Sequence, residues 1–381
     1  MATTRCVILG GGFGGVAAAH RLKEHLRDDV DVTLIDRRGT FMMGLRIIPV
    51  LVGLADRASG TRSLEHLTRK GIRYVRDEVR GIDVAGKTVT TTTGTVGYDA
   101  LIVALGAELR PDLVPGFDPT GSSLYDPEQA EAIAARVAHI DRGRLGIGIL
   151  GAPYKCPPAP YEAAFLIDEA LRRRGVRDRV ELEVFTPQPS SLPVAGPVAC
   201  AEVETRMAAR GIRFFPGRKV VAIEGAEVMF ESERRRYDVF IGVAPHRAPA
   251  VVKTSGLARP EWIRPRKDTC EVEDATNVFA VGDVTEMPLA NGMMLPKAGM
   301  FAEAQGRIAA DVIADRFAGS GKAAGFDGYG YCFFEVGEGK ATAVRGHFFT
   351  EPQPTIEVAS PNPETLEEKR RFETTRLAAW F

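Results

Sequence analysis

The sequence has few of the residues that build disulfide frameworks and metal sites: five cysteines and six histidines among 381 residues. The cysteines are odd in number and widely spaced, which excludes the paired spacing of a small secreted disulfide scaffold. They stand at Cys6, Cys156, Cys200, Cys270 and Cys332. Each thiol is therefore expected to be a packing residue or a reactive group, and we expect no metal site.

An excess of charge of one sign is also missing, since 49 Lys and Arg residues stand against 50 Asp and Glu residues. Without a basic field we expect no nucleic-acid partner. No stretch reaches the roughly 18 consecutive apolar residues of a membrane-spanning helix. The first 15 residues lack the apolar core and cleavage site of a secretory signal. We expect a cytoplasmic protein, with any membrane contact being peripheral, at the inner face of the cytoplasmic membrane.

Apolar runs ending in glycine recur along the chain and predict an α/β fold. Residues 5–10, 14–27 and 30–35 have the strand, helix and strand pattern of a βαβ unit. Similar patterns at 145–151, 159–173 and 180–185 predict a second unit. We expect two Rossmann-like dinucleotide-binding domains, the second inserted in the first, plus a small C-terminal α+β domain. The expected boundaries are 1–108 with 265–318, then 109–264, and then 319–381, which opens with a Gly/Ala/Ser hinge (319–325) and has a hairpin around G-E-G-K.

A G-x-G-x-x-G match opens the first predicted helix directly after a strand. In this pattern the first glycine permits the tight turn, the second lets the backbone approach a pyrophosphate, and the third allows close helix packing. An acidic residue ends the next strand, where it can bind a ribose diol. The residues expected to bind the dinucleotide here are Gly10, Gly12, Phe13, Gly14, Gly15, Asp36 and Arg37.

Two later motifs favour FAD over NAD as this dinucleotide. Ala104-Leu105-Gly106 ends a buried strand, and Gly282-Asp283 ends the run N-V-F-A-V-G-D. The run resembles two-domain flavoproteins of the disulfide-reductase superfamily, in which the aspartate binds the flavin ribityl chain. The resemblance implies that Ala104, Gly106, Gly282 and Asp283 contact FAD.

The place where a second dinucleotide fingerprint belongs reads G-A-P-Y-K-C-P-P-A-P-Y-E, residues 151–162. Only Gly151 of the fingerprint remains, and four prolines remove amides that would face a pyrophosphate. The loop offers instead Cys156, next to Lys155, whose positive charge favours a thiolate.

This loop, L-P-K-A-G (295–299) and F-A-E-A-Q-G (301–306) resemble sulfide:quinone oxidoreductases and the flavoprotein subunits of flavocytochrome c sulfide dehydrogenases, and the likeness covers nearly the whole chain. In that family two cysteines flank the flavin ring, attack sulfide sulfur and carry a growing polysulfide bridge. The resemblance implies that these are Cys156 and Cys332. It also makes Glu162 a general base, with a solvated carboxylate as the alternative, and places Lys297 near the flavin, with an exposed lysine as the alternative.

The chain departs from the family pattern at three places. Met42-Met43 stands where flavocytochrome c relatives tether the flavin through a cysteine, so FAD should be bound non-covalently. No third cysteine lies between Cys6 and Cys156, and Pro197 stands where the family has a histidine. The electron acceptor is therefore less firmly indicated than the flavin.

Other residues have weaker signals. Cys6 and Cys270 lie in predicted strands and are expected to pack, Cys200 has no motif around it, and His246 is expected to be structural or to lie near the acceptor side of the flavin. The tail contains Trp380 and Phe381 near Arg370, Arg371 and Arg376. This tail fits anchoring at a membrane interface and equally fits docking on the protein's own core or on a second subunit.

The function predicted first is FAD-dependent oxidation of sulfide or another small sulfur substrate, with electrons passed to a quinone. A type II NADH:quinone dehydrogenase and a flavin subunit that reduces a cytochrome c partner are the alternatives among flavoenzymes. A redox-sensing protein that forms a Cys156–Cys332 disulfide is the alternative outside enzymes. The sulfur product and the formation of a homo-oligomer stay open.

Overall fold

The computed structural model describes residues 3–319 and 324–381. Residues 320–323, in the predicted hinge segment, lie outside the described residues. The first sheet contains five parallel strands in the order β19-β9-β1-β2-β5. Their bounds are Val278–Ala280, Ala100–Val103, Thr4–Leu9, Val30–Asp36 and Arg73–Arg76. The predicted α/β class with parallel-sheet, Rossmann-like cores is therefore confirmed.

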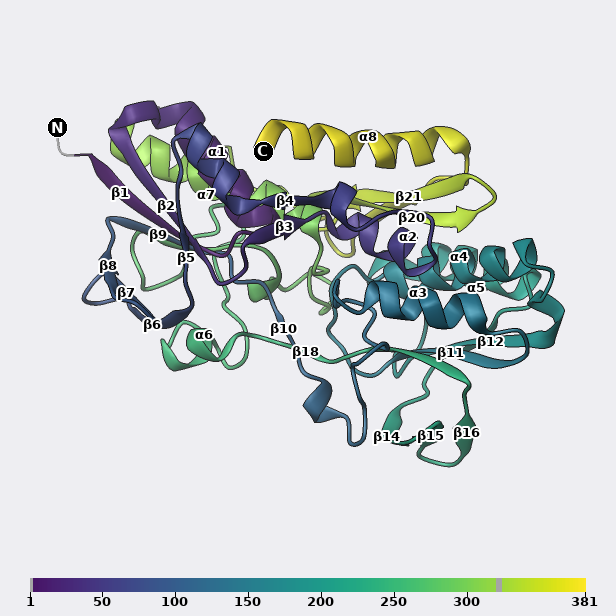
Figure 1. The fold of residues 1–381 in the computed structure, drawn as a ribbon. Helices are drawn as coiled ribbons and strands as arrows, with labels where there is room; N and C mark the ends of the chain where they lie inside the picture. The colour runs from purple at the N-terminus through teal and green to yellow at the C-terminus, as the bar shows by residue number, and fades with distance from the viewer. Residues whose placement is uncertain (1–2, 320–323) are drawn as a thin grey trace.

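Helices α1 (Phe13–Leu26) and α7 (Gly299–Ala318) pack together against this sheet (Figure 1). Glycines let α1 approach the turn at Gly10 on one side and α7 on the other. A Cβ atom on Gly15 would lie 1.9 Å from the Gly10 carbonyl oxygen, and one on Gly306 would lie 2.2 Å from that of Gly14. Because such distances are far below van der Waals contact, this packing requires glycine at both positions.

The second sheet is also parallel, with the order β13-β12-β11-β17. Its strands span Arg213–Phe215, Val180–Phe185, Gly143–Ile149 and Val239–Val243. Helices α3 (Ala130–His139), α4 (Ala159–Arg173) and α5 (Gly196–Ala209) accompany it. The residue boundaries that we expected for the three domains stay a prediction.

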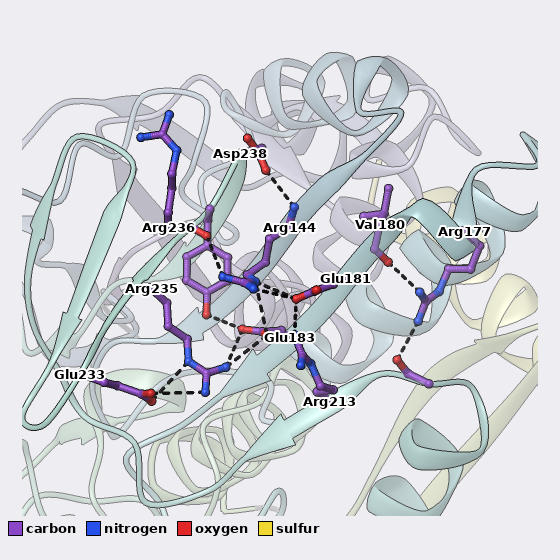
Figure 2. Close-up of polar contacts among 12 residues, drawn as sticks. Arg144, Arg177, Val180, Glu181, Glu183, Arg213, Glu233, Arg235, Arg236 and Asp238 are labelled. Carbon is purple, nitrogen blue, oxygen red and sulfur yellow. Dashed lines mark hydrogen bonds and ion pairs between the residues drawn. The ribbon is translucent and has the colours of Figure 1, made fainter.

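A charged cluster covers the other face of the second sheet (Figure 2). Glu183 is completely buried there and pairs with Arg213 and with Arg235, while the Tyr237 hydroxyl donates to it at 2.7 Å. Burying a carboxylate is tolerated when charged donors surround it. The cluster attaches the antiparallel strands β14 (Val220–Glu224), β15 (Glu227–Phe230) and β16 (Arg234–Arg236) to the sheet, so its role is structural.

The C-terminal part forms an antiparallel sheet of β20 (Tyr329–Gly337), β21 (Lys340–His347) and β22 (Thr355–Val358), followed by helix α8 (Pro363–Trp380). The turn between β20 and β21 is the predicted G-E-G-K hairpin. The Asn362 side chain caps α8 by accepting from the Thr365 amide at 2.7 Å. Figure 1 shows α8 lying along β20 and β21, with the C-terminus close to α1 and α7.

The remaining elements are short. They are β3 (Thr40–Met42), α2 (Ile47–Leu51), β4 (Thr61–Ser63), β6 (Val79–Asp83), β7 (Thr88–Thr91), β8 (Thr95–Gly97), β10 (Glu108–Leu109), β18 (His246–Arg247) and α6 (Ala250–Thr254). None of the helices in the described part of the chain has the length and hydropathy needed to cross a membrane.

The tail docks on the protein's own core. The Trp380 ring is 4% exposed and meets Phe13 and Phe41 edge-on, with ring centroids 5.8 and 5.6 Å apart. Its carbonyl oxygen lies 3.0 Å from Nε2 of His20. Of the alternatives weighed for the tail, docking on the protein's own core describes Trp380, because its indole is buried against Phe13 and Phe41.

Candidate functional site

A single cavity of 1710 Å³ brings most of the predicted site residues together. The residues that line it include Gly10, Gly12, Phe13, Gly14, Asp36, Arg37, Ala104, Gly106, Cys156, Glu162, Gly282, Asp283 and Cys332. Two predicted site residues are not among those lining it, namely Gly15 and Lys297. Gly15 lies beneath the turn, where it packs against the Gly10 carbonyl oxygen as described above.

The glycine turn presents the start of α1 to the cavity. The Gly10 amide donates to the Ile35 carbonyl at 2.8 Å, which fixes the turn between β1 and β2. Helix α1 begins at Phe13, and no side chain caps its first amides. Free amides at a helix N-terminus bind phosphate well. This turn can therefore hold a pyrophosphate.

Asp36 stands at the end of β2 with its carboxylate fixed in place. It accepts hydrogen bonds from the Gly11 amide at 2.6 Å and from the Arg38 amide at 2.7 Å, and the Arg38 guanidinium pairs with it at 3.0 Å. The neighbouring Arg37 is at the rim, where it faces Glu78 at 4.0 Å. This end of the cavity suits a ribose and its base.

Asp283 lies in the turn after β19 and has an oxygen without a hydrogen-bond partner in the described residues. Its Oδ1 atom is buried and has no hydrogen-bond partner within residues 3–319 and 324–381. Burial raises the pKa of this carboxyl, against the attraction of Lys297 and Lys155. A buried carboxylate oxygen without a partner in the protein is a ready acceptor for hydroxyl groups of a ligand.

Lys297 is hydrogen-bonded to the backbone of Asp283. Its ammonium donates to the carbonyl oxygens of Asp283 and Thr285 at 2.8 and 2.9 Å, and it lies 3.5 Å from the ring centroid of Trp262. Burial lowers the pKa of Lys297 to about 8. The alternative of an exposed lysine is therefore wrong. The Lys297 side chain is not among those that line the cavity either, because its ammonium is hydrogen-bonded to the backbone around Asp283.

Cys156 and Cys332 meet in the cavity. Their sulfur atoms lie 3.8 Å apart. Cys156 is in the loop before α4, where its amide donates to the Lys297 carbonyl at 2.6 Å and its carbonyl accepts from the Tyr125 hydroxyl at 2.9 Å. Cys332 is in β20. Its hydrogen bond with Cys156 and its burial raise the pKa of the Cys332 thiol, so Cys332 keeps its proton in this pair.

A buried ion triad lies beside the thiols. Glu162, in the first turn of α4, is 2% exposed, and Lys369 of α8 is 1% exposed. The Lys369 ammonium donates to Glu162 at 2.5 Å and to Glu335 of β20 at 2.9 Å. Burial raises the pKa of Glu162 to about 7, although Lys369 opposes this rise. The alternative of a solvated carboxylate at Glu162 is therefore wrong.

Lys369 is a site residue that sequence reasoning missed. It stands in the run E-E-K-R-R, which reads as a solvated helix face. The buried carboxylates of Glu162 and Glu335 hold the pKa of Lys369 well above its usual range. No local pattern could have separated this lysine from its exposed neighbours.

Comparison with known proteins agrees with this geometry. A family profile described as "Pyridine nucleotide-disulphide oxidoreductase" matches residues 4–306. The chain belongs to the pyridine nucleotide-disulphide oxidoreductase family.

Three relatives of this pyridine nucleotide-disulphide oxidoreductase are instructive. A mitochondrial sulfide:quinone oxidoreductase of Dictyostelium discoideum is 28% identical over 75% of the chain and 66% of that protein. The alternative NAD(P)H-ubiquinone oxidoreductase C1 of Arabidopsis thaliana is 27% identical over 77% of the chain and 63% of that protein. In both, the match spans less than two thirds of the relative. The solved sulfide:quinone oxidoreductase of Aquifex aeolicus has the same fold, with a TM-score of 0.90 and 23% identity over 99% of this chain and 91% of that one.

Side chains pack closely at the glycine loop of the second sheet of this pyridine nucleotide-disulphide oxidoreductase. Pro245 packs directly against Gly151. The buried Tyr161 donates its hydroxyl to the Ser191 carbonyl at 2.8 Å, which ties α4 to the loop after β12. Pro245 therefore occupies the space next to Gly151.

The other cysteines and His246 are not among the residues that line the cavity. Cys6, Cys200 and Cys270 are buried and free, and burial raises the pKa of Cys6 to about 12. The His246 ring is fully buried edge-on to Tyr125, and its Nε2 atom has no partner within the described residues. Within those residues, no group of His, Cys, Asp and Glu side chains could hold a metal ion.

Proposed function

We propose that this oxidoreductase is an FAD-dependent sulfide:quinone oxidoreductase that oxidises sulfide at Cys156 and Cys332. The observation that supports this most is the 3.8 Å approach of the two sulfur atoms inside the cavity that also contains the glycine turn and Asp283. The Dictyostelium relative, named a sulfide:quinone oxidoreductase, adds support.

The residues that line the cavity fit FAD, bound non-covalently. The amides at the start of α1 suit the pyrophosphate, Asp36 suits the ribose diol, and the unused oxygen of Asp283 suits the ribityl hydroxyls. Met42 and Met43 offer no thiol for a covalent link. When bound, FAD would accept two electrons from a sulfur nucleophile and release them to an acceptor.

The cysteine pair can hold the substrate sulfur. The 3.8 Å gap between Cys156 and Cys332 is longer than one S–S bond of about 2.05 Å and shorter than two such bonds end to end. One sulfur atom therefore fits between them as a bridge. Joining a sulfide sulfur to a cysteine sulfur removes two electrons and forms one S–S bond, and both electrons would leave through the flavin to the quinone. Closing the bridge to the second cysteine forms a second S–S bond and removes two more electrons, so a complete bridge needs two such rounds.

Glu162 can hold and release the protons of this reaction. Its raised pKa of about 7 lets it exchange a proton near neutral pH. Lys369 fixes its carboxylate at the end of the cavity where Ile47, Ile48 and Phe372 supply apolar walls. These walls suit the ring of a quinone, which takes up two electrons and two protons to become a quinol.

A quinone is carried in lipid, so we propose peripheral contact with the inner face of the cytoplasmic membrane. The end of α2 suits this contact. Ile47 and Ile48 of α2 line the cavity, and Leu54, just beyond α2, is 49% exposed. A homo-oligomer and a cytochrome acceptor stay alternatives.

A type II NADH:quinone dehydrogenase is the second candidate, and the Arabidopsis relative favours it. It would bind NADH at the second sheet and would need no thiols. The prolines around Cys156 and the Tyr161–Ser191 hydrogen bond argue against NADH at that loop. The close thiol pair would then have no function.

The test is anaerobic reduction of the purified flavoprotein by sulfide and, separately, by NADH, followed as bleaching of the flavin absorption. We expect rapid bleaching by sulfide that is lost in Cys156→Ser and Cys332→Ser and kept in the control Cys200→Ser. Bleaching by NADH alone would contradict the proposal and support the NADH dehydrogenase. Bleaching by sulfide that survives both serine variants would remove the cysteine pair from the mechanism.

A further inference from the structure

Lys155 has a side chain that faces the cavity without a partner. It lines the cavity, and within residues 3–319 and 324–381 its ammonium makes no hydrogen bond or ion pair. Its Nζ atom lies over the face of the Tyr125 ring, 5.5 Å from the ring centroid. A half-buried ammonium without a carboxylate partner is costly, which suggests that a ligand completes its surroundings.

The charges around Lys155 locate it along the cavity. Burial lowers the pKa of the Lys155 ammonium. Asp283 and Asp126 attract the ammonium and oppose this lowering, whereas Arg38 repels it. Its backbone bridges to Lys297, and the next residue is the thiol Cys156. Lys155 therefore lies between the carboxylate assigned to the ribityl chain and the thiol assigned to sulfide chemistry.

The other cationic side chains that line the cavity face carboxylates or lie at its Asp36 end. Arg38 pairs with Asp36, Arg37 faces Glu78, and Arg57 faces Glu131 at 3.8 Å. Arg76 stands opposite Asp36 in the ladder of β2 and β5, so it belongs to the Asp36 end of the cavity and not to the thiol end. Lys155 is thus the one cation lining the described cavity that lies near the thiols without a carboxylate partner.

Two further groups near Lys155, Lys297 and His246, do not place a positive charge in the cavity. Lys297 is not among the residues that line the cavity, and its ammonium donates to the backbone carbonyls of Asp283 and Thr285. His246 is neutral, because burial and the nearby Lys155 lower its pKa to about 3. The positive charge in this part of the cavity therefore comes from Lys155.

We propose that Lys155, rather than Lys297, supplies the positive charge that faces the flavin ring and stabilises its reduced form. This inference rests on the proposed binding of FAD. Reduction of a flavin by two electrons with uptake of one proton leaves one negative charge on the ring. A fixed cation in a site with little water stabilises such a charge. Lys155 thereby raises the midpoint potential of the flavin and assists its reduction by sulfur.

The test measures the flavin midpoint potential of the holoenzyme by reduction with dithionite against a reference dye, without sulfide. We expect a more negative potential in Lys155→Met, a value close to that of the unaltered protein in Lys155→Arg, and no change in Lys219→Met, which alters an exposed lysine far along the chain. Lys155→Gln gives the same comparison if the methionine variant binds no flavin. An unchanged potential in the uncharged variants would overturn the inference.

Sulfite titration provides a second measure of the same charge, because sulfite adds to oxidised flavin as an anion. We expect affinity for sulfite to fall at least tenfold in Lys155→Met and to be kept in Lys155→Arg. Equal sulfite affinity in all the proteins would contradict the role of Lys155. Failure of the proposed function looks different: the unaltered protein would then bind no FAD, or would bind FAD that sulfide does not bleach.

Discussion

The sulfur atoms of Cys156 and Cys332 lie 3.8 Å apart although 176 positions separate these residues in the chain. One belongs to the loop that precedes α4 and the other to the β20–β21 hairpin. The second sheet and the C-terminal sheet therefore each contribute one thiol to the cavity. Any change in how these two parts pack will alter the distance between the thiols.

The thiol pair should gain sulfur on exposure to sulfide. After incubation with sulfide and a quinone, we expect intact-mass spectrometry to detect chains that carry at least one extra sulfur atom, because the gap accommodates one bridging atom. The control Cys200→Ser should keep this gain, since Cys200 is buried elsewhere. Absence of added sulfur in the unaltered protein, or its persistence in a Cys156→Ser/Cys332→Ser double variant, would contradict a sulfur-carrying pair.

The pH dependence of sulfide oxidation should reflect Glu162. Since its pKa is raised to about 7, the carboxyl is mostly protonated below this pH and ionised above it. We expect the rate to rise with pH through about 7 and then to level off. Glu162→Gln should lose this rise and lower the rate by about 10²–10⁴-fold. The exposed Glu357→Gln serves as the control, and an unchanged profile in Glu162→Gln would exclude Glu162 as the base.

Removal of Lys369 should destabilise the protein strongly. Lys369→Met leaves Glu162 and Glu335 buried without their cation, which costs about 3–5 kcal/mol. We expect a lower midpoint in urea unfolding, with the exposed Lys340→Met as the matched control. The double variant Glu162→Gln/Lys369→Met should lose less than the sum of its single variants. Full additivity would show that the two side chains do not interact.

His246 should make the protein sensitive to acid. Its pKa is lowered to about 3 in the folded protein, whereas an unfolded histidine has a pKa near 6.5. Between these values the unfolded chain binds the extra proton, so stability is present above about pH 6.5 and is lost as the pH falls towards 3. We expect His246→Phe to unfold at lower pH than the unaltered protein, measured by circular dichroism. The exposed His139→Asn should not, and a common acid midpoint for all three would contradict this assignment.

Local patterns were enough to predict the strands and the cofactor turn. A buried parallel strand is a short apolar run ending at glycine, so Thr4–Leu9 and Gly143–Ile149 could be placed from their own residues. The approach of Gly10 and Asp36 follows from the βαβ unit. The pairing of Cys156 with Cys332 came from a family resemblance, because nothing local links two residues so far apart.

Three features needed the tertiary structure. Lys369 looks exposed in its charged run, and only the packing of α8 on α4 and β20 buries it. Trp380 resembles a membrane anchor until its ring is seen against Phe13 and Phe41. The direction of the Lys297 ammonium depends on two carbonyls brought together by the turn after β19. In each case the deciding contact is distant in sequence.

The first sheet is divided along the chain, and this sets the order in which the nascent protein can fold. The strands of the second sheet are all synthesised once Val243 has been added, whereas β19 of the first sheet ends at Ala280 and α7 ends at Ala318. The inner unit can therefore be complete while α1 still lacks the helix that packs against it. Cys332 is translated later still. The Cys156 thiol is therefore synthesised long before Cys332. During that interval it has no partner thiol and is open to reaction with other thiols.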